Sequence, residues 1–119
     1  MAIDVGMRIE KLNDRTRYFA VVNGNYIGNL TIQYNLNVYA AQITSFRIFD
    51  KNFRKLGVGR MLLEQALEDH KEKDILVIPM PYDDNEMIVS ELKEIYCKCG
   101  FKDHPIHDFA MILERSPKN

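Results

Sequence analysis

The feature that most constrains the fold is a change in the spacing of apolar residues about half-way along the chain. Before residue 50, apolar and polar side chains alternate, as at Leu30, Ile32 and Tyr34, which is the period of a half-buried antiparallel strand. From Val58 to about Lys71, apolar residues instead recur on one helical face. A chain that changes period in this way is expected to fold as a mixed α/β domain.

The first half predicts strands joined by short turns. Strand-forming runs cover Val5 to Ile9, Tyr18 to Val22, Tyr26 to Tyr34, and Val38 to Phe49. Residues rich in Asn, Asp and Gly separate these runs, as tight turns between strands require. The order therefore favours an antiparallel meander of four strands.

The second half predicts a strand, helix and strand unit followed by a further helix. Asp74 to Ile78 is almost wholly apolar, which is typical of a parallel strand covered on both faces. A second helix runs from about Glu86 to Lys98 and stops at Gly100. One or two strands follow, chiefly Asp108 to Arg115. We expect a single domain over residues 1–119, with a mixed and mostly antiparallel sheet around the central unit.

Composition excludes several classes of protein. Sixteen Lys and Arg against seventeen Asp and Glu give a net charge of -1, so nucleic-acid binding by the whole chain is not expected. The longest apolar run, Ile75 to Pro81, is shorter than the roughly 20 residues of a membrane span. The amino terminus lacks a basic region followed by an apolar stretch, which predicts a cytoplasmic protein. Cys97 and Cys99 are too close for an ordinary disulfide.

The most informative segment lies where a strand gives way to a helix. Gly57 and Gly59 stand at this junction, where unpaired helix N–H groups and the helix dipole attract an anion. Four cations surround the glycines: Lys51, Arg54, Lys55 and Arg60. The segment predicts a polyanionic ligand, although a glycine-rich turn beside a solvated basic patch has the same sequence. A third glycine and the P-loop pattern are absent, which weakens both nucleotide interpretations.

Two motifs resemble the GCN5-related N-acetyltransferase (GNAT) family. Arg54, Gly57 and Gly59 match its pyrophosphate-binding pattern (Q/R)xxGx(G/A). Ile95 to Phe101 is similar to its late motif, an aromatic residue on a helix and then a Gly-Phe pair opening the next strand. The resemblance covers about residues 38–115 and implies a GNAT-like acyl-CoA N-acyltransferase fold, in which the fourth and fifth strands splay apart around coenzyme A.

The resemblance also implies a reaction and a set of site residues. The reaction is acetyl transfer from acetyl-CoA to a primary amine. Tyr96 would be the general acid that protonates the departing thiolate, and a main-chain N–H near Phe49 would stabilise the oxyanion. Tyr96 also fits a second interpretation, a helix tyrosine that packs its ring in the core. The pyrophosphate would lie, chiefly on backbone N–H groups, against Arg54, Lys55, Leu56, Gly57, Val58, Gly59 and Arg60.

The chain departs from the family in two ways that bear on catalysis. No carboxylate lies between Gln42 and Phe49 to act as general base, so Asp83 and Asp84 are the candidates, with solvated loop residues as the alternative. Val89 also replaces an asparagine often found seven residues before the tyrosine. These departures keep open a catalytically inactive coenzyme A-binding or protein-binding module, for example an inhibitor of a host factor.

A third departure concerns the acceptor. Only turn-forming residues such as Asn13 and Asp14 replace the two helices that usually follow the first strand. The acceptor side is therefore expected to be open, which suits a lysine of another protein. The short frame and the Asp83–Asp84 loop are similar to small, phage-type members of the family.

Three further hypotheses concern partners and metals. Local nucleic-acid binding by Lys51 to Arg60 is a weaker alternative, and exposed sheet edges leave a homodimer open. No metal site is expected, because the CxC spacing of Cys97 and Cys99 lacks the usual zinc-knuckle geometry, even with His104 and His107 nearby. A thiol close to the coenzyme would be an acetyl acceptor, whereas one packed on the helix stripe would belong to the core.

Overall fold

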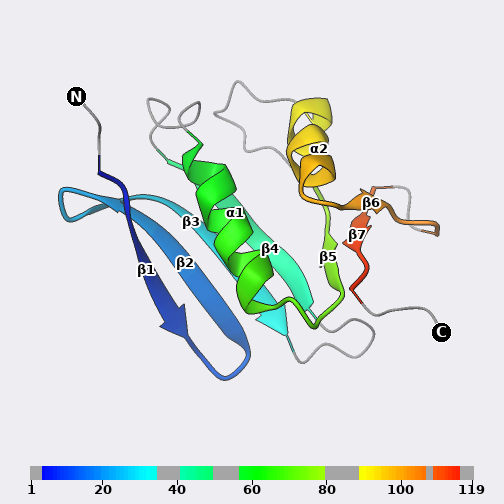
Figure 1. Ribbon diagram of the computed structural model, residues 1–119, viewed down its shortest axis with the longest axis horizontal. Helices are drawn as coiled ribbons and strands as arrows, with labels where there is room; N and C mark the ends of the chain where they lie inside the picture. Colours follow the sequence, from blue (N-terminus) through cyan, green and yellow to red (C-terminus); the bar gives the residue numbers. More distant parts are fainter. Residues whose placement is uncertain (1–3, 35–40, 50–56, 80–88, 107–108, 116–119) are drawn as a thin grey trace.

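A computed structural model describes residues 4–34, 41–49, 57–79, 89–106 and 109–115. The elements follow the predicted order of strands and helices (Figure 1). They are β1 (Gly6–Lys11), β2 (Arg15–Val22), β3 (Asn25–Tyr34), β4 (Ala41–Ile48), α1 (Val58–Asp69), β5 (Ile75–Val77), α2 (Val89–Lys98), β6 (Lys102–Asp103) and β7 (Met111–Leu113).

The strands form one seven-stranded sheet in the order β1-β2-β3-β4-β5-β7-β6. β1 to β4 are antiparallel to their neighbours, β4 and β5 are parallel, and β5, β7 and β6 are again antiparallel. This arrangement confirms the mixed, mostly antiparallel sheet with a central parallel unit. A turn at Asn13 and Asp14 joins β1 directly to β2, so no helices lie between these strands.

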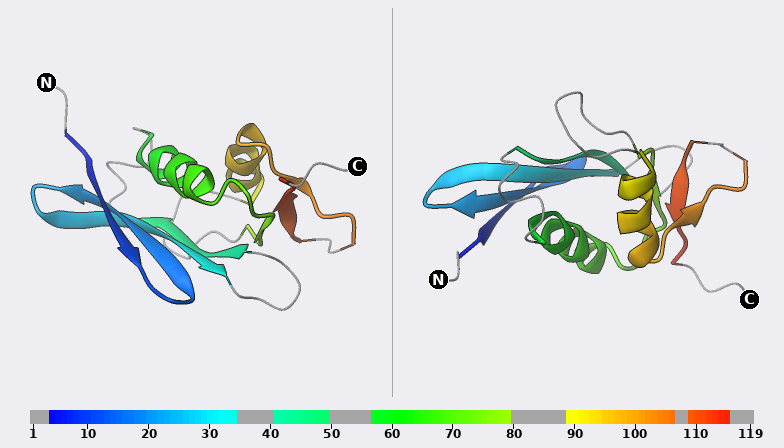
Figure 2. Two further views of the ribbon diagram at one scale, coloured as in Figure 1. Left: turned by 60° about the horizontal axis from the view of Figure 1, so that its bottom comes forward. Right: turned by 90° about the horizontal axis from the view of Figure 1, so that it is seen from above.

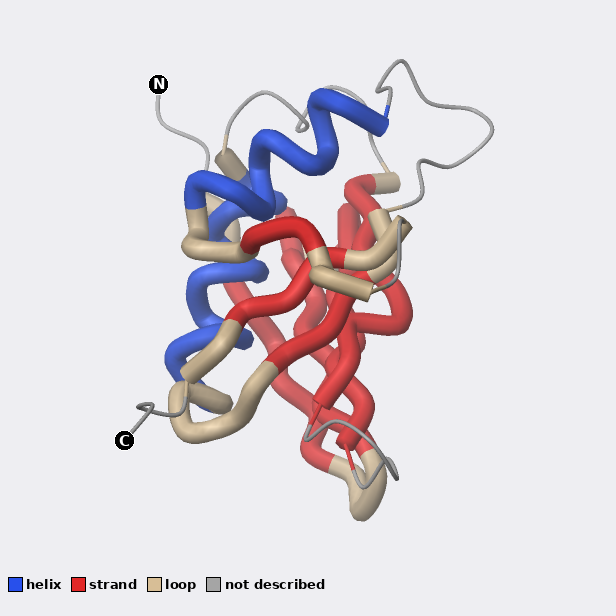
Figure 3. The backbone as a smooth tube through the Cα atoms, turned by 90° about the vertical axis from the view of Figure 1, so that its right-hand side faces the viewer, coloured by secondary structure: helices blue, strands red, loops and turns tan. Residues whose placement is uncertain are grey.

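Both helices lie on the same side of the sheet (Figures 2 and 3). The predicted apolar stripe of α1 faces the strands, where Leu62, Leu63 and Ala66 are fully buried. They pack in one core cluster with Leu30 and Ile32 of β3, and each buried leucine or isoleucine stabilises the fold by about 1.5–3 kcal/mol. Within the described ranges, no helix has the length and apolar character needed to cross a membrane.

The helix ends match the expected signals closely. α1 ends at Asp69, two residues before the predicted Lys71, because His70 caps it: the ring Nδ1 lies 2.9 Å from the carbonyl oxygen of Ala66. α2 ends at Lys98, as predicted, and Gly100 follows with a φ of +101°, which favours glycine. The N–H groups of Gly100 and Phe101 donate back to the last turn of the helix, the hydrogen-bond pattern of a Schellman motif.

Some predicted boundaries lie outside the described residues. This applies to the start of the second helix at Glu86, the first residues of the strand expected from Val38, and Asp108 of the last strand. Of the one or two strands expected at the carboxyl end, the structure contains two, β6 and the short β7.

One buried hydrogen bond ties β2 to the end of α1 and generates a stability prediction. The fully buried Tyr18 donates its hydroxyl to Oδ2 of Asp69 at 2.8 Å. Burial first, and then the Asp69 carboxylate, raise the pKa of Tyr18. Tyr18→Phe should lower the free energy of unfolding at pH 7 by about 1–2 kcal/mol, measured by urea denaturation.

The raised pKa also fixes the sign of a pH effect. Above about pH 10 an unfolded tyrosine ionises while the folded Tyr18 stays neutral. This ionisation lowers the free energy of unfolding of the wild type, but not that of Tyr18→Phe, which has no hydroxyl at this position. The gap between the two proteins should therefore shrink as the pH rises past 10. The control is Tyr26→Phe, because Tyr26 is 45% exposed; a gap that widens with pH would contradict the assignment.

Candidate functional site

The first turn of α1 has the geometry of an anion site. Gly57 precedes the helix with φ 79° and ψ 11°, no side chain caps the turn, and no acidic residue lies in it. The first helical hydrogen bond runs from the N–H of Met61 to the carbonyl of Gly57 at 3.0 Å. The N–H groups of Val58, Gly59 and Arg60 precede this bond, so they are oriented outward along the helix axis. Such a turn binds a phosphate without rearrangement.

The two glycines of this turn serve different physical purposes. Gly57 has a positive φ, and no described residue would lie within 4 Å of a Cβ added there, so its role is to supply the backbone conformation of the turn. Gly59 has ordinary helical geometry, but its added Cβ would lie 3.2 Å from Cζ of Phe46 and 3.6 Å from Cγ1 of Ile48. Gly59 therefore permits the close approach of α1 to β4.

β4 carries an irregularity that was not predicted from the sequence. Thr31 pairs with Ser45 and Ile32 pairs with Ile43, so Thr44 is an extra, bulged residue. The signal was present, because apolar residues alternate at Ala41 and Ile43 and then shift phase to Phe46 and Ile48.

The bulge lies where β4 and β5 separate. Their parallel pairing covers only Ala41 to Ile43 against Ile75 to Val77, and β5 ends there, whereas β4 continues to Ile48. The half of β4 beyond Thr44 thus has no β5 residue opposite it. This is the predicted splaying of the fourth and fifth strands.

The hydrogen-bond alternation of β4 shows which main-chain groups face this gap. The N–H of Phe49 donates to the carbonyl of Ile27 at 2.7 Å, so that group is engaged with β3. Alternation along an antiparallel strand then turns the N–H of Phe46 away from β3, toward the side that β5 has left. Phe49 itself lies at the end of β4, 45% exposed, with the Arg47 guanidinium 5.7 Å from its ring centroid.

Tyr96 of α2 approaches the same half of β4. Its side chain is only 2% exposed, with its ring 6.0 Å from that of Phe46 and 5.3 Å from that of Phe101. Phe46 therefore links the first turn of α1 to Tyr96, since it also contacts the position of Gly59. Sequence reasoning singled out Tyr96 and Gly59 but not the phenylalanine between them.

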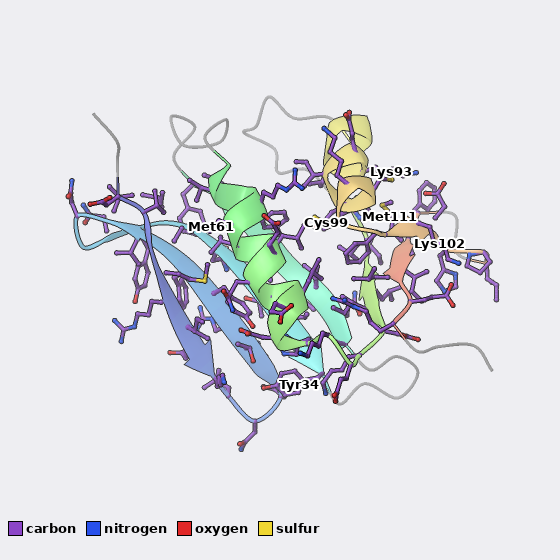
Figure 4. The ribbon with its side chains drawn as sticks, in the orientation of Figure 1. Tyr34, Met61, Lys93, Cys99, Lys102 and Met111 are labelled. Carbon is purple, nitrogen blue, oxygen red and sulfur yellow. The ribbon has the colours of Figure 1, made fainter. Side chains whose placement is uncertain are left out.

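Cys99 directly follows α2 and lies between α2 and α1 (Figure 4). Burial raises the pKa of its thiol; the Arg60 guanidinium opposes this shift and the Glu64 carboxylate adds to it. A thiol with a raised pKa is a poor nucleophile near neutral pH. Arg60 also lies 3.5 Å from Glu64 in an exposed pair, so its contribution to the turn is mainly its backbone N–H.

Five of the predicted site residues lie outside the described part of the chain. They are Arg54, Lys55, Leu56, Asp83 and Asp84. The structure describes the other six. Gly57, Val58, Gly59 and Arg60 begin α1, and Phe46 contacts both this turn and Tyr96. Phe49 follows β4, where its N–H is bonded to Ile27.

Comparisons with known proteins give structural likeness only. No family model matches the chain, and no curated protein sequence matches it. Solved structures do. The ribosomal-protein-S18-alanine N-acetyltransferase from Escherichia coli superposes with a TM-score of 0.66 at 16% identity, over 92% of this chain and 74% of that one.

Two further structures show the range of sizes among the matches. The PaiA N-acetyltransferase from Thermoplasma acidophilum, in complex with coenzyme A, gives a TM-score of 0.62 at 21% identity, over 85% of this chain and 61% of that one. The anti-CRISPR protein AcrVA5 gives 0.60 at 17% identity, over 92% of this chain and 99% of that one. The chain has the GNAT acyl-CoA N-acyltransferase fold, which confirms the fold that the sequence motifs imply.

The contact between Gly59 and Phe46 generates a prediction about packing. Gly59→Val should lower the free energy of unfolding by about 1–3 kcal/mol, because its side chain must displace the Phe46 ring or the helix. In a Phe46→Leu background the same change should cost less, a coupling that a double-mutant cycle by urea denaturation measures. The control is Glu68→Val, at a helix position that is 71% exposed. It measures how much a valine at an exposed helix position lowers the free energy of unfolding, which is expected to be about 0.5 kcal/mol. Equal costs for Gly59→Val in both backgrounds would contradict the close approach.

Proposed function

We propose that the protein is an N-acetyltransferase that moves an acetyl group from acetyl-CoA to a primary amine. The observation that carries this proposal is the contact between the helix turn that begins at Gly57 and the part of β4 beyond Thr44, where β5 does not pair with β4 and the N–H of Phe46 points away from β3. The first feature suits a diphosphate, and the second suits an extended arm bearing amides. Coenzyme A contains both, in that order.

The coenzyme is assigned to these two features in turn. Its diphosphate lies on the N–H groups of Val58, Gly59 and Arg60, with Arg54, Lys55 and Leu56 from the preceding segment completing the site. Its pantetheine arm runs along β4, past Thr44, where amide groups of the arm replace the partner strand that β5 does not provide. The thioester then lies near Phe46 and Tyr96, whose rings are 6.0 Å apart.

The reaction makes three demands that this arrangement can meet. The acceptor amine must lose a proton, which costs about 4 kcal/mol for a lysine at pH 7.4; Asp83 and Asp84 are the proposed bases. The amine nitrogen then attacks the thioester carbon, and a backbone N–H stabilises the resulting oxyanion. The N–H of Phe46 is better placed for this than the N–H of Phe49, because the latter already donates to the carbonyl of Ile27. The carbon–sulfur bond breaks, and the Tyr96 hydroxyl donates a proton to the departing thiolate.

The acceptor is proposed to be a lysine of another protein. The direct turn from β1 to β2 at Asn13 and Asp14 leaves that end of the sheet without helices. A small amine gains most from an enclosed pocket, whereas a side chain carried on a large surface needs an open approach.

A second candidate is an inactive module that binds coenzyme A or a protein, such as an inhibitor of a host factor. One observation favours it. Tyr96 is 2% exposed, which is also expected of a purely structural tyrosine.

Coenzyme binding is tested by a matched pair of substitutions at Gly57. A side chain there enters open space, and both Asn and Asp tolerate a positive φ better than other residues. Gly57→Asp places a carboxylate on the turn and should weaken acetyl-CoA binding at least tenfold relative to Gly57→Asn, a difference of about 1.4 kcal/mol. Isothermal titration calorimetry measures both. Equal affinities, or no heat with the wild type, would remove the diphosphate from this turn.

Catalysis is tested at Tyr96. Tyr96→Phe should lower turnover by about 100-fold, the lower end for general acid catalysis, with acetyl-CoA affinity nearly unchanged. Release of coenzyme A is followed with a panel of lysine-containing proteins and free polyamines as acceptors, and Tyr26→Phe is the control because Tyr26 is exposed. Unchanged turnover would exclude Tyr96 as the acid. Reaction with polyamines alone would exclude a protein acceptor, and no turnover with intact coenzyme binding would favour the inactive module.

A further inference from the structure

β1 forms an outer edge of the sheet and leaves one side of its main chain unpaired among the described strands. It pairs there only with β2, and it stands first in the sheet order. Ile9 lies on the core side of this strand, opposite the buried Tyr18, yet remains 41% exposed. An exposed edge with an apolar centre invites pairing with another strand.

The direction of the free main-chain groups follows from the register with β2. The N–H of Leu12 donates to the carbonyl of Arg15, so Leu12 and Arg15 form a hydrogen-bonded pair. Alternation then places Arg8 and Glu10 in hydrogen-bonded pairs with β2, at Phe19 and Arg17. The N–H and carbonyl groups of Met7, Ile9 and Lys11 consequently point outward.

These outward groups restrict how a second copy can pair with the edge. In a two-fold symmetric antiparallel pair, one residue faces its own copy across the axis. Centring the axis on Arg8 places two like charges opposite each other, and centring it on Glu10 does the same. Centring it on Ile9 places Ile9 against Ile9, Met7 against Lys11, and Arg8 against Glu10 of the partner subunit.

The register centred on Ile9 satisfies hydrogen bonding and charge together. The facing pairs of Met7, Ile9 and Lys11 are those with outward main-chain groups, so each pair exchanges two hydrogen bonds. Arg8 and Glu10 of the partner subunit then form a non-hydrogen-bonded pair, in which side chains approach most closely. Each dimer contains this ion pair twice, and the two exposed Ile9 side chains meet at its centre.

We propose that the chain forms a homodimer through antiparallel β1–β1 pairing about a two-fold axis at Ile9, which joins two seven-stranded sheets into one. This interface is independent of the proposed activity. Two strands, β2 and β3, separate β1 from β4, so the proposed interface does not involve the first turn of α1 or the part of β4 beyond Thr44.

Charge reversal tests both the interface and its register. Wild type should sediment at twice the 13.9 kDa chain mass in analytical ultracentrifugation. Arg8→Glu gives a chain with two acidic residues at the interface, and Glu10→Arg gives a chain with two basic ones, so each variant alone should be monomeric. An equimolar mixture of the two should form a heterodimer, because both facing pairs between positions 8 and 10 are then opposite in charge.

The controls separate this interface from general charge effects. Lys71→Glu changes an exposed cation just after α1 and should leave the dimer intact, and circular dichroism checks that each variant is folded. A monomeric wild type would overturn the proposal. It would also be overturned if both single variants remained dimeric, or if the folded variants failed to associate when mixed.

Discussion

The contact between the first turn of α1 and the middle of β4 is the constraint on which the site depends. Gly59 brings the helix backbone against Phe46 and Ile48, so close that a Cβ at position 59 would lie 3.2 Å from the Phe46 ring, which would then have to shift. This approach sets the unpaired N–H groups of the turn beside the half of β4 that β5 leaves. Phe46 also positions α2 relative to this turn, because its ring contacts that of Tyr96.

Sequence patterns predicted the elements of the fold because each pattern reports a local physical requirement. The alternation around Leu30 and Ile32 marks one buried face of β3, and both residues are fully buried. Gly100 follows α2 with a positive φ that few other residues adopt. Gly57, which the sequence places at the junction before the helix, directly precedes α1 with φ 79°.

What the sequence did not predict depends on contacts between elements. The role of Gly59 requires knowing that α1 lies against Phe46, a residue thirteen positions earlier in a different element. The engagement of the Phe49 N–H with Ile27 follows from the register between β3 and β4, which the bulge at Thr44 shifts. A phase change in the apolar pattern of β4 is the one local trace of that bulge. Arg54, Lys55, Leu56, Asp83 and Asp84 remain predictions.

Two places in the sheet lack a described partner strand, namely the β4 main chain at Phe46 and the outer edge of β1, and their surroundings determine what can bind each. Phe46 lies inside the sheet order, with the first turn of α1 and Tyr96 of α2 against its side chain. A thin, extended ligand fits such a position better than another strand with side chains on both faces. The outer edge of β1 has no described neighbour, so a complete strand can approach it. Position in the sheet thus directs a small extended ligand to β4 and a protein partner to β1.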